Sequence, residues 1–199
     1  MTKLDAVNRV LVAVGRDRVK ALDTDGASPA AEAERCLDQC ELDVQALGWH
    51  YNTRNDVELT PDANDHIAVP TGVITIDTDT DDQGTNVTVL GDGLFNLDDN
   101  TDEFDSTLKV AYTLRYSFHC IPQLIQEYIV ACTAVEFNLT RFGTRDRHPY
   151  LEGRKTLAWG MAVREDEDKR DTDILATLDA IKVRGYRVTN GAIVPVEVA

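Results

Sequence analysis

Lysine and arginine are absent from the middle of this chain. Residues 56–105 hold fourteen Asp and Glu and no Lys or Arg, within a 199-residue chain of formal net charge −15. Binding to nucleic-acid phosphates requires a basic face, so this balance argues against a nucleic-acid-binding protein. The stretch is rich in Asp, Thr, Gly and Asn, which favour strands and turns. It is expected to be either a solvated β region or a face that repels polyanions or meets a basic partner.

Long apolar runs are also missing. No stretch of about 18 uncharged apolar residues occurs, so no transmembrane helix and no membrane partner are expected. The first residues, Met1 to Asp5, lack the apolar segment of a signal peptide. The sequence therefore predicts a soluble protein made in a cytoplasm.

Cysteine is scarce, and no arrangement of the cysteines resembles a metal site. They form no C-x-x-C pair and have no nearby pair of histidines, so buried thiols are expected instead. Cys36 and Cys40 could share one face of a helix. The four are Cys36, Cys40, Cys120 and Cys132.

Catalytic motifs are absent too. The chain has no G-x-S-x-G, H-E-x-x-H, P-loop or G-x-G-x-x-G pattern. His119 stands beside Cys120, but neighbours on a strand point to opposite faces and make a poor base and nucleophile. Residues 77–82 begin like a calcium loop, but Asp82 and Thr88 stand where that loop requires Gly and Glu. A solvated acidic turn is the expected alternative, and no catalytic residue, cofactor or metal is predicted.

The periodicity of apolar residues predicts four helices around a set of short strands. Leu4, Val7, Leu11 and Val14 mark a first helix over residues 3–14. Ser28 caps a second helix, whose stripe runs from Ala33 through Leu37, Cys40 and Val44 to Leu47. A third helix is expected from Pro122 to about Phe142, with the stripe Ile125, Tyr128, Cys132, Val135, Leu139 and Phe142. A fourth is expected to start near Pro149, to carry Leu151, Leu157, Ala158 and Met161, and to end in a charged, solvated part. Strands are expected at 56–60, 73–77, 86–90, 94–97 and 107–117.

This order predicts an α+β fold, a small helical bundle of about four helices with an inserted acidic β domain. The tail is apolar but too short to build a core, so we expect an extended C-terminal arm that packs on something else. The predicted boundaries are 1–55 and 121–184 for the two parts of the helical domain, 56–120 for the β domain and 185–199 for the arm.

The first 52 residues carry a recognisable pattern. Residues 4–15 read L-D-A-V-N-R-V-L-V-A-V-G, and an Ala-rich helix then leads into G-W-H-Y-N at residues 48–52. This resembles the tail tubular protein A family of short-tailed podoviruses, the head-to-tail adaptors. The later order agrees, with strand 107–117, Ile121-Pro122, Tyr128-Ile129, Phe137 and Arg141-Phe142-Gly143. The acidic middle departs from any fixed pattern.

The resemblance implies a structural virion protein at the head–tail junction rather than an enzyme. Such adaptors assemble as a ring, expected to be a dodecamer, between the portal protein and the tail nozzle, a protein like tail tubular protein B. Genome DNA passes through the lumen during ejection without specific binding. The helical part would pack between neighbours and against the portal, the β domain would face the nozzle, and the arm would insert along the portal.

Three residue sets follow from these expectations. The portal interface is expected to use Tyr186, Arg187, Val188, Ile193, Val194 and Val196. An acidic face, on the lumen or the nozzle side, is expected at Asp77, Asp79, Asp81, Asp82, Asp98, Asp99 and Asp102. The family pattern and core are expected to include Asn8, Leu11, Gly15, Gly48, Trp49 and Asn52, where Trp49 is either a core anchor or a subunit contact.

Two other functions stay open at this point. A tail-associated glycan hydrolase acting on host-surface polysaccharide would need two carboxylates at a fixed separation, and the chain offers many. A calcium-stabilised structural module is the other.

Overall fold

A computed structural model describes most of the chain, which forms two compact units, Met1–Ala162 and Val163–Ala199. The described residues are 1–22, 26, 28–78, 85–142, 146–170, 186–189 and 192–195. The helices are α1 (Lys3–Ala13), α2 (Pro29–Gln45), α4 (Gln123–Phe137) and α5 (His148–Arg170), with short helical turns η1 (Phe118–Cys120) and η2 (Asn138–Phe142). The strands are β1 (Thr53–Leu59), β2 (Val73–Thr78), β3 (Val87–Leu90), β4 (Gly93–Asn96), β5 (Leu108–Leu114), β6 (Tyr186–Thr189) and β7 (Ala192–Pro195). The predicted α+β class and the four helices are confirmed.

The first two helices begin at capping residues. The Thr2 side chain accepts from the Asp5 backbone N–H while the Asp5 carboxylate accepts from the Thr2 backbone, which is a capping box. At the start of α2, the Ser28 hydroxyl accepts from the Ala31 N–H at 3.2 Å, and Pro29 is the first helical residue. Satisfied N-terminal donors therefore fix where both helices start.

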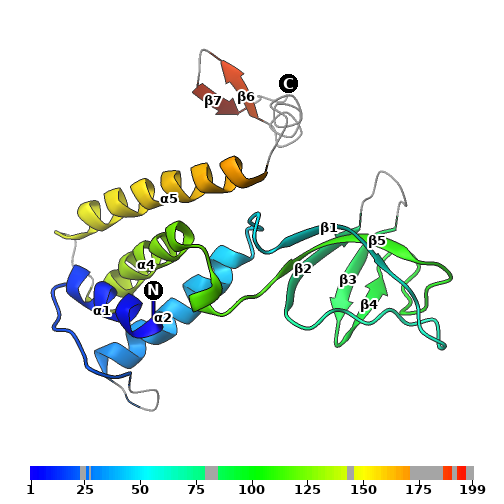
Figure 1. The fold of residues 1–199 in the computed structure, drawn as a ribbon, viewed down its shortest axis with the longest axis horizontal. Helices are drawn as coiled ribbons and strands as arrows, with labels where there is room; N and C mark the ends of the chain where they lie inside the picture. Colours follow the sequence, from blue (N-terminus) through cyan, green and yellow to red (C-terminus); the bar gives the residue numbers. More distant parts are fainter. Residues whose placement is uncertain are drawn as a thin grey trace. The chain divides into compact units, whose positions relative to one another are not determined.

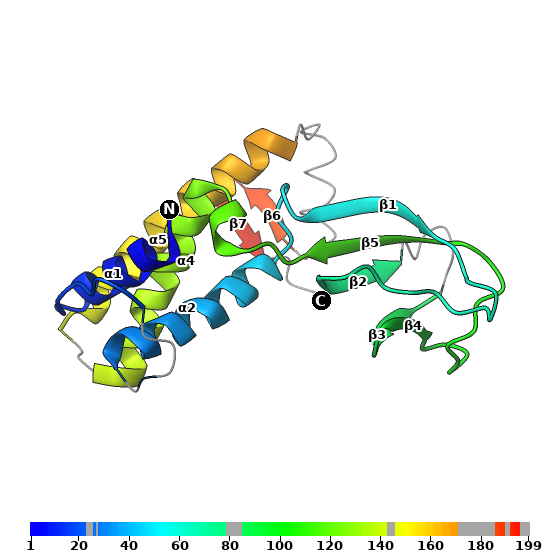
Figure 2. The same ribbon diagram turned by 60° about the horizontal axis from the view of Figure 1, so that its bottom comes forward.

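Helix α4 is the centre of the helical part and contacts both α1 and α2; Figures 1 and 2 show the three helices side by side. Because it packs on two sides, its buried surface is wider than a single stripe. The buried apolar residues are Ile125, Ile129, Val130, Ala134, Val135 and Phe137.

The predicted run of this helix to Phe142 is wrong in its last turn. Regular α-helix ends at Phe137, and Asn138–Phe142 form a π-helical turn. The wider turn breaks the stripe, and Leu139, expected inside, is half exposed. The side chain of Phe142 lies outside the described residues.

Three other apolar residues of the predicted helices are also exposed. Leu47 follows the end of α2 and points to solvent, and Leu157 and Met161 lie on an outer face of α5. That helix is buried instead through Leu151 and Ala162. An apolar residue at helical spacing thus does not show which face a neighbouring helix covers.

Strand β5 is the middle of a three-stranded antiparallel sheet of order β1-β5-β2 (Figure 1). Strands β3 and β4 form a separate hairpin. Gly91 and Asp92 make the turn between them, in a Gly-Asp-Gly sequence that favours a two-residue hairpin turn. The predicted strands are confirmed, although the first begins at Thr53 rather than at residue 56. The β part has its own core of Ile67, Val87, Leu94, Phe104, Leu108 and Val110.

Buried and exposed side chains alternate only along the first half of β5. Leu108 and Val110 are buried in the β core, but the next buried residue is Thr113, which lies on the opposite face. The Thr113 hydroxyl is 2.6 Å from that of Thr75. Its methyl carbon is close to Gly48, only 3.2 Å from where a Cβ at that position would lie. The second half of β5 therefore packs against the end of α2.

Two buried amide side chains join the helical part to the sheet. Asn52, fully buried, donates from Nδ2 to the Gln45 carbonyl at 2.9 Å and to the Leu114 carbonyl at 3.0 Å. Its Oδ1 accepts from the Trp49 N–H at 2.8 Å. Gln45, also fully buried, pairs with the backbone of Tyr116, donating at 2.9 Å and accepting at 2.8 Å. The end of α2 is thereby held to the end of β5.

The second unit contains the charged end of α5 and the hairpin β6-β7. Arg170 Nε and the Asp166 carboxylate form an ion pair at 2.7 Å, one turn apart on α5. In the predicted arm, Tyr186–Thr189 and Ala192–Pro195 pair as antiparallel strands. The other residues of the arm lie outside the described part of the chain.

We predict that Asn52→Ala lowers the free energy of unfolding by about 2–4 kcal/mol, because it removes three buried hydrogen bonds, to the Gln45 and Leu114 carbonyls and from the Trp49 N–H. Asn55→Ala, at an exposed position three residues away, is the matched control and should change stability by less than about 0.5 kcal/mol. Urea unfolding followed by circular dichroism measures both. Equal effects for the two variants would contradict the role of Asn52.

Candidate assembly surfaces

The family-pattern residues of the first helix fix the chain that follows it. Asn8 is paired with the backbone of Val19, donating from Nδ2 at 3.0 Å and accepting at Oδ1 at 2.7 Å. Leu11 is buried. Gly15 has a φ of +79°, and a Cβ there would lie 2.1 Å from the Arg147 guanidinium, so its backbone conformation favours glycine. Asn8, Leu11 and Gly15 therefore contribute to the fold of the helical part.

Gly48, Trp49 and Asn52 form the turn between α2 and β1. Gly48 has a φ of +75°, and Trp49 is buried with its Nε1 donating to the Val44 carbonyl at 2.6 Å. The ring of Trp159 meets that of Trp49 edge to face at 5.7 Å. Trp49 therefore lies in the core and not at a surface.

Of the predicted acidic residues, the four that the structure describes lie on two different segments of the β part. Asp77 is exposed on β2, whereas Asp98, Asp99 and Asp102 lie in the turn after β4. There the Asp98 carboxylate accepts from the Asn86 N–H at 2.7 Å, and Asp99 accepts from the Asn96 amide at 2.9 Å. These two carboxylates therefore stabilise the turn that follows β4. Three others, Asp79, Asp81 and Asp82, fall outside the described residues.

Three of the four thiols are shielded from solvent. Burial raises the pKa of Cys40 to about 11 and also raises the pKa of Cys36 and of Cys132. Such thiols stay protonated near neutral pH and are poor nucleophiles and metal ligands. Cys120 is exposed beside His119 in η1, with the Ser117 hydroxyl 3.7 Å from its sulfur. Across the described ranges, no group of three or more His, Cys, Asp or Glu side chains could hold a metal ion.

A polar cavity of about 520 Å³ lies where α1 and α2 meet the end of β5. Lys3 pairs there with Asp38 at 2.7 Å and with Glu34 at 3.1 Å. Glu41 is buried, and burial raises the pKa of its carboxyl. The lining residues are Lys3, Asp38, Glu41, Gly72, Arg115, Ser117, Phe118 and His119.

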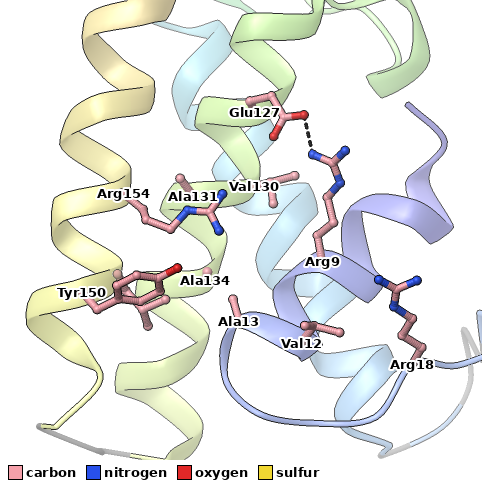
Figure 3. A pocket seen from close by; sticks show the side chains of 11 residues that line it. Arg9, Val12, Ala13, Arg18, Glu127, Val130, Ala131, Ala134, Tyr150 and Arg154 are labelled. Carbon is pink, nitrogen blue, oxygen red and sulfur yellow. Dashed lines mark hydrogen bonds and ion pairs between the residues drawn. The ribbon is translucent and has the colours of Figure 1, made fainter.

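A second cavity, of about 370 Å³, combines an apolar floor with arginines and lies between α1, α4 and the first part of α5 (Figure 3). Arg9 projects from α1 and is paired with Glu127 of α4, while Tyr150 and Arg154 project from α5. The lining residues are Arg9, Val12, Ala13, Arg18, Glu127, Val130, Ala131, Ala134, Tyr150, Leu151 and Arg154. We call this the arginine pocket; the sequence pattern did not predict it.

The outer face of α5 continues from this pocket as an apolar stripe. Tyr150, Leu157 and Met161 recur at helical spacing with Arg154 between them, and Tyr150 and Leu157 are 62% and 67% exposed. On the β part, Leu90 at the tip of the β3-β4 hairpin is 64% exposed. The contiguous stripe on α5 is a candidate surface for protein contacts.

The predicted portal-interface residues cannot be placed by their side chains. Tyr186, Arg187 and Val188 lie on β6, and Ile193 and Val194 lie on β7. Their side chains, and Val196 as a whole, are outside the described residues.

We predict that one thiol reacts much faster than the others with Ellman's reagent in the folded protein. Cys120 is exposed, whereas burial and a raised pKa protect Cys36, Cys40 and Cys132. The Cys120→Ser variant should lose the fast phase, while Cys40→Ser should keep it. A fast phase that survives Cys120→Ser would contradict this order of reactivity.

We also predict a pH-dependent effect of Glu41→Gln. Burial raises the pKa of folded Glu41 above its ordinary value of 4.5, so the folded state binds the proton more tightly than the unfolded state does. Its contribution to stability therefore falls as pH rises from about 4.5 to the folded pKa, and is constant above it. The variant should gain stability relative to the wild type across that window, in urea unfolding between about pH 4 and pH 8. A stability difference independent of pH would show that burial does not shift this carboxyl.

No helix within the described part of the chain has both the length and the hydrophobicity that crossing a membrane requires.

Comparison with known proteins identifies the family. The chain is 27% identical over 144 residues to the tail tubular protein A of Klebsiella phage KP34, a match that covers 72% of this chain and 75% of that protein. A family model described as tail tubular protein matches residues 4–171. That match covers the described helices and the strands β1 to β5. The chain therefore belongs to the tail tubular protein family, the structural proteins of phage tails.

Proposed function

We propose that this protein is the adaptor at the head–tail junction of a virion, where copies form a ring between the portal and the tail nozzle. The observation that carries the proposal is the family match over residues 4–171, together with a curated relative named tail tubular protein A. The exposed apolar stripe on α5 and the exposed Leu90 supply surfaces that contacts in such an assembly would cover. The protein is made in the host cytoplasm and acts in the virion.

The charge of the chain suits a channel for DNA. A ring whose β parts carry fourteen acidic and no basic residues over 56–105 would present a strongly negative surface. DNA sliding past such a surface is repelled, so it passes without specific binding. On this proposal Asp77, Asp98, Asp99 and Asp102 face the channel or the nozzle side, as do Asp79, Asp81 and Asp82.

The C-terminal arm is the proposed portal contact. Its apolar residues, which include Val188, Ile193, Val194 and Val196, have too few neighbours in so short a segment to form a core. Packing against the portal would bury them. Tyr186 and Arg187 would contribute an aromatic and a charged anchor, the residue types that are most enriched at interface hot spots.

The glycan hydrolase alternative has no observation in its favour. In the polar cavity, Asp38 is ion-paired with Lys3, and the Glu41 carboxyl oxygen lies 3.3 Å from the Gln45 amide. These contacts give both carboxylates structural partners.

The proposed function is tested by native mass spectrometry of this protein alone and mixed with the portal ring of the same phage. We expect the portal ring to gain a full ring of copies. Absence of any portal complex would refute the adaptor function, and glycan hydrolase activity would then be assayed.

We predict that truncation after Arg184 leaves the fold of Met1–Ala162 intact but abolishes portal binding, because it removes the proposed anchors. Circular dichroism and thermal melting report on the fold, and native mass spectrometry on the complex. Alanine at both Tyr186 and Arg187 is a milder variant that should weaken the complex without shortening the chain. Full portal binding by the truncated protein would refute the assignment of the arm.

A further inference from the structure

Two of the three arginines that line the arginine pocket form no ion pair with any residue that the structure describes. Arg9 is paired with Glu127. Arg18 and Arg154 have no acidic partner within 4 Å in the part of the chain that the structure describes, although the whole chain carries a net charge of −15. Guanidinium groups are most often matched by carboxylates or phosphates. Carboxylates or phosphates from outside this copy would pair with these arginines.

The floor of the pocket indicates which kind of anion fits. Val12, Val130 and Ala134 supply an apolar surface beneath the charged rim. A nucleic-acid backbone would use the arginines but would leave this apolar surface without a partner. A protein segment with a carboxylate next to an aliphatic side chain would use both features.

The β3-β4 hairpin of the chain has this combination at its tip. Leu90 is 64% exposed, and the Asp92 side chain is exposed two residues later. Gly91 between them has a φ of +66°, and a Cβ there would meet nothing within 4 Å. The tip is therefore narrow as well as acidic and apolar. Leucine fits a cavity of about 370 Å³ with room for the neighbouring carboxylate at its rim.

We propose that the hairpin tip of one copy, Leu90 and Asp92, occupies the arginine pocket of a second copy. Leu90 packs on the apolar floor, and the Asp92 carboxylate pairs with an arginine at the rim, Arg154 on the α5 side or Arg18 on the α1 side. The contact joins two different surfaces of the chain, so it is heterologous and leads to a ring or an open filament rather than a closed dimer. This deepens the proposed function by naming a contact between copies, and it rests on that function only for the need to assemble.

The attraction between the hairpin tip and the arginine pocket must overcome the electrostatic repulsion between two copies that each carry a net charge of −15. At about 0.15 M salt the Debye length is about 8 Å, so most of the distant repulsion is screened. The paired charges of the proposed contact lie much closer together than this, at hydrogen-bonding distance. The contact is therefore compatible with the net charge of the chain.

Two variants test the two halves of the contact. Arg18→Glu with Arg154→Glu disables the pocket and leaves the tip intact, whereas Leu90→Ser with Asp92→Lys disables the tip and leaves the pocket intact. In analytical ultracentrifugation at about 0.15 M salt, we expect concentration-dependent association of the wild type. Each double variant should weaken it at least about tenfold, which corresponds to about 1.4 kcal/mol.

Mixing the two variants gives the sharper result. The pocket variant keeps a tip and the tip variant keeps a pocket, so one contact can form between them but the chain of contacts cannot continue. We therefore expect one-to-one heterodimers and nothing larger. A contact between identical surfaces, such as one α5 stripe against another, would not be restored by mixing.

Matched controls separate the contact from general effects of charge and hydrophobicity. Arg35→Glu reverses an exposed charge on α2 outside the pocket, and Leu97→Ser removes an exposed leucine outside the tip. Both should associate like the wild type. Circular dichroism and thermal melting of all variants show whether they are folded.

Several results would overturn the proposal. These are a wild type that stays monomeric, controls that weaken association as much as the double variants do, or a mixture that forms no heterodimer. Retardation of short duplex DNA that depends on Arg18 and Arg154 but not on Leu90 would assign the pocket to nucleic acid instead. Portal binding is measured separately, so loss of portal binding with an intact tip–pocket contact would refute only the adaptor function.

Discussion

The arrangement of the first unit depends on two buried amides, Asn52 and Gln45, that satisfy backbone groups of both α2 and β5. Where a helix ends against a sheet, carbonyls and N–H groups from both elements lose water. An amide side chain can donate and accept at once, and these two supply partners to each side. The helical part and the β part are thereby held as one unit, although each has a core of its own.

The helical part and the β part, which these amides hold together, differ in charge. The helical part contributes the arginine pocket and the stripe on α5, whereas the β part contributes carboxylates without any compensating Lys or Arg over residues 56–105. Holding the two parts together separates opposite charges within one copy. Separation of this kind favours head-to-tail association, because each copy presents both complementary surfaces.

Prediction from sequence succeeded where local chemistry decides the structure. Ser28 and Pro29 set the start of α2, Gly91 and Asp92 form a hairpin turn, and all five predicted strands are present. Prediction failed where contacts with a neighbouring helix or strand determine which side chains are buried. Leu47, Leu139, Leu157 and Met161 have the spacing of core residues but are exposed, and Thr113 reverses the alternation of β5. Gln45 gave no signal at all, because a polar residue on a helix is ordinarily solvated.

Four features could be predicted without coordinates: the α+β class, the order of the elements, the acidic character of the β part and the resemblance to the tail tubular proteins. These follow from periodicity, capping residues, turn chemistry and composition, which act within a few residues of the chain. Only the tertiary structure decided which faces are covered, which arginines share a pocket and how α2 is joined to β5. Such features depend on contacts between residues far apart in the chain, as between Asn52 and Leu114, and local patterns carry no information about them.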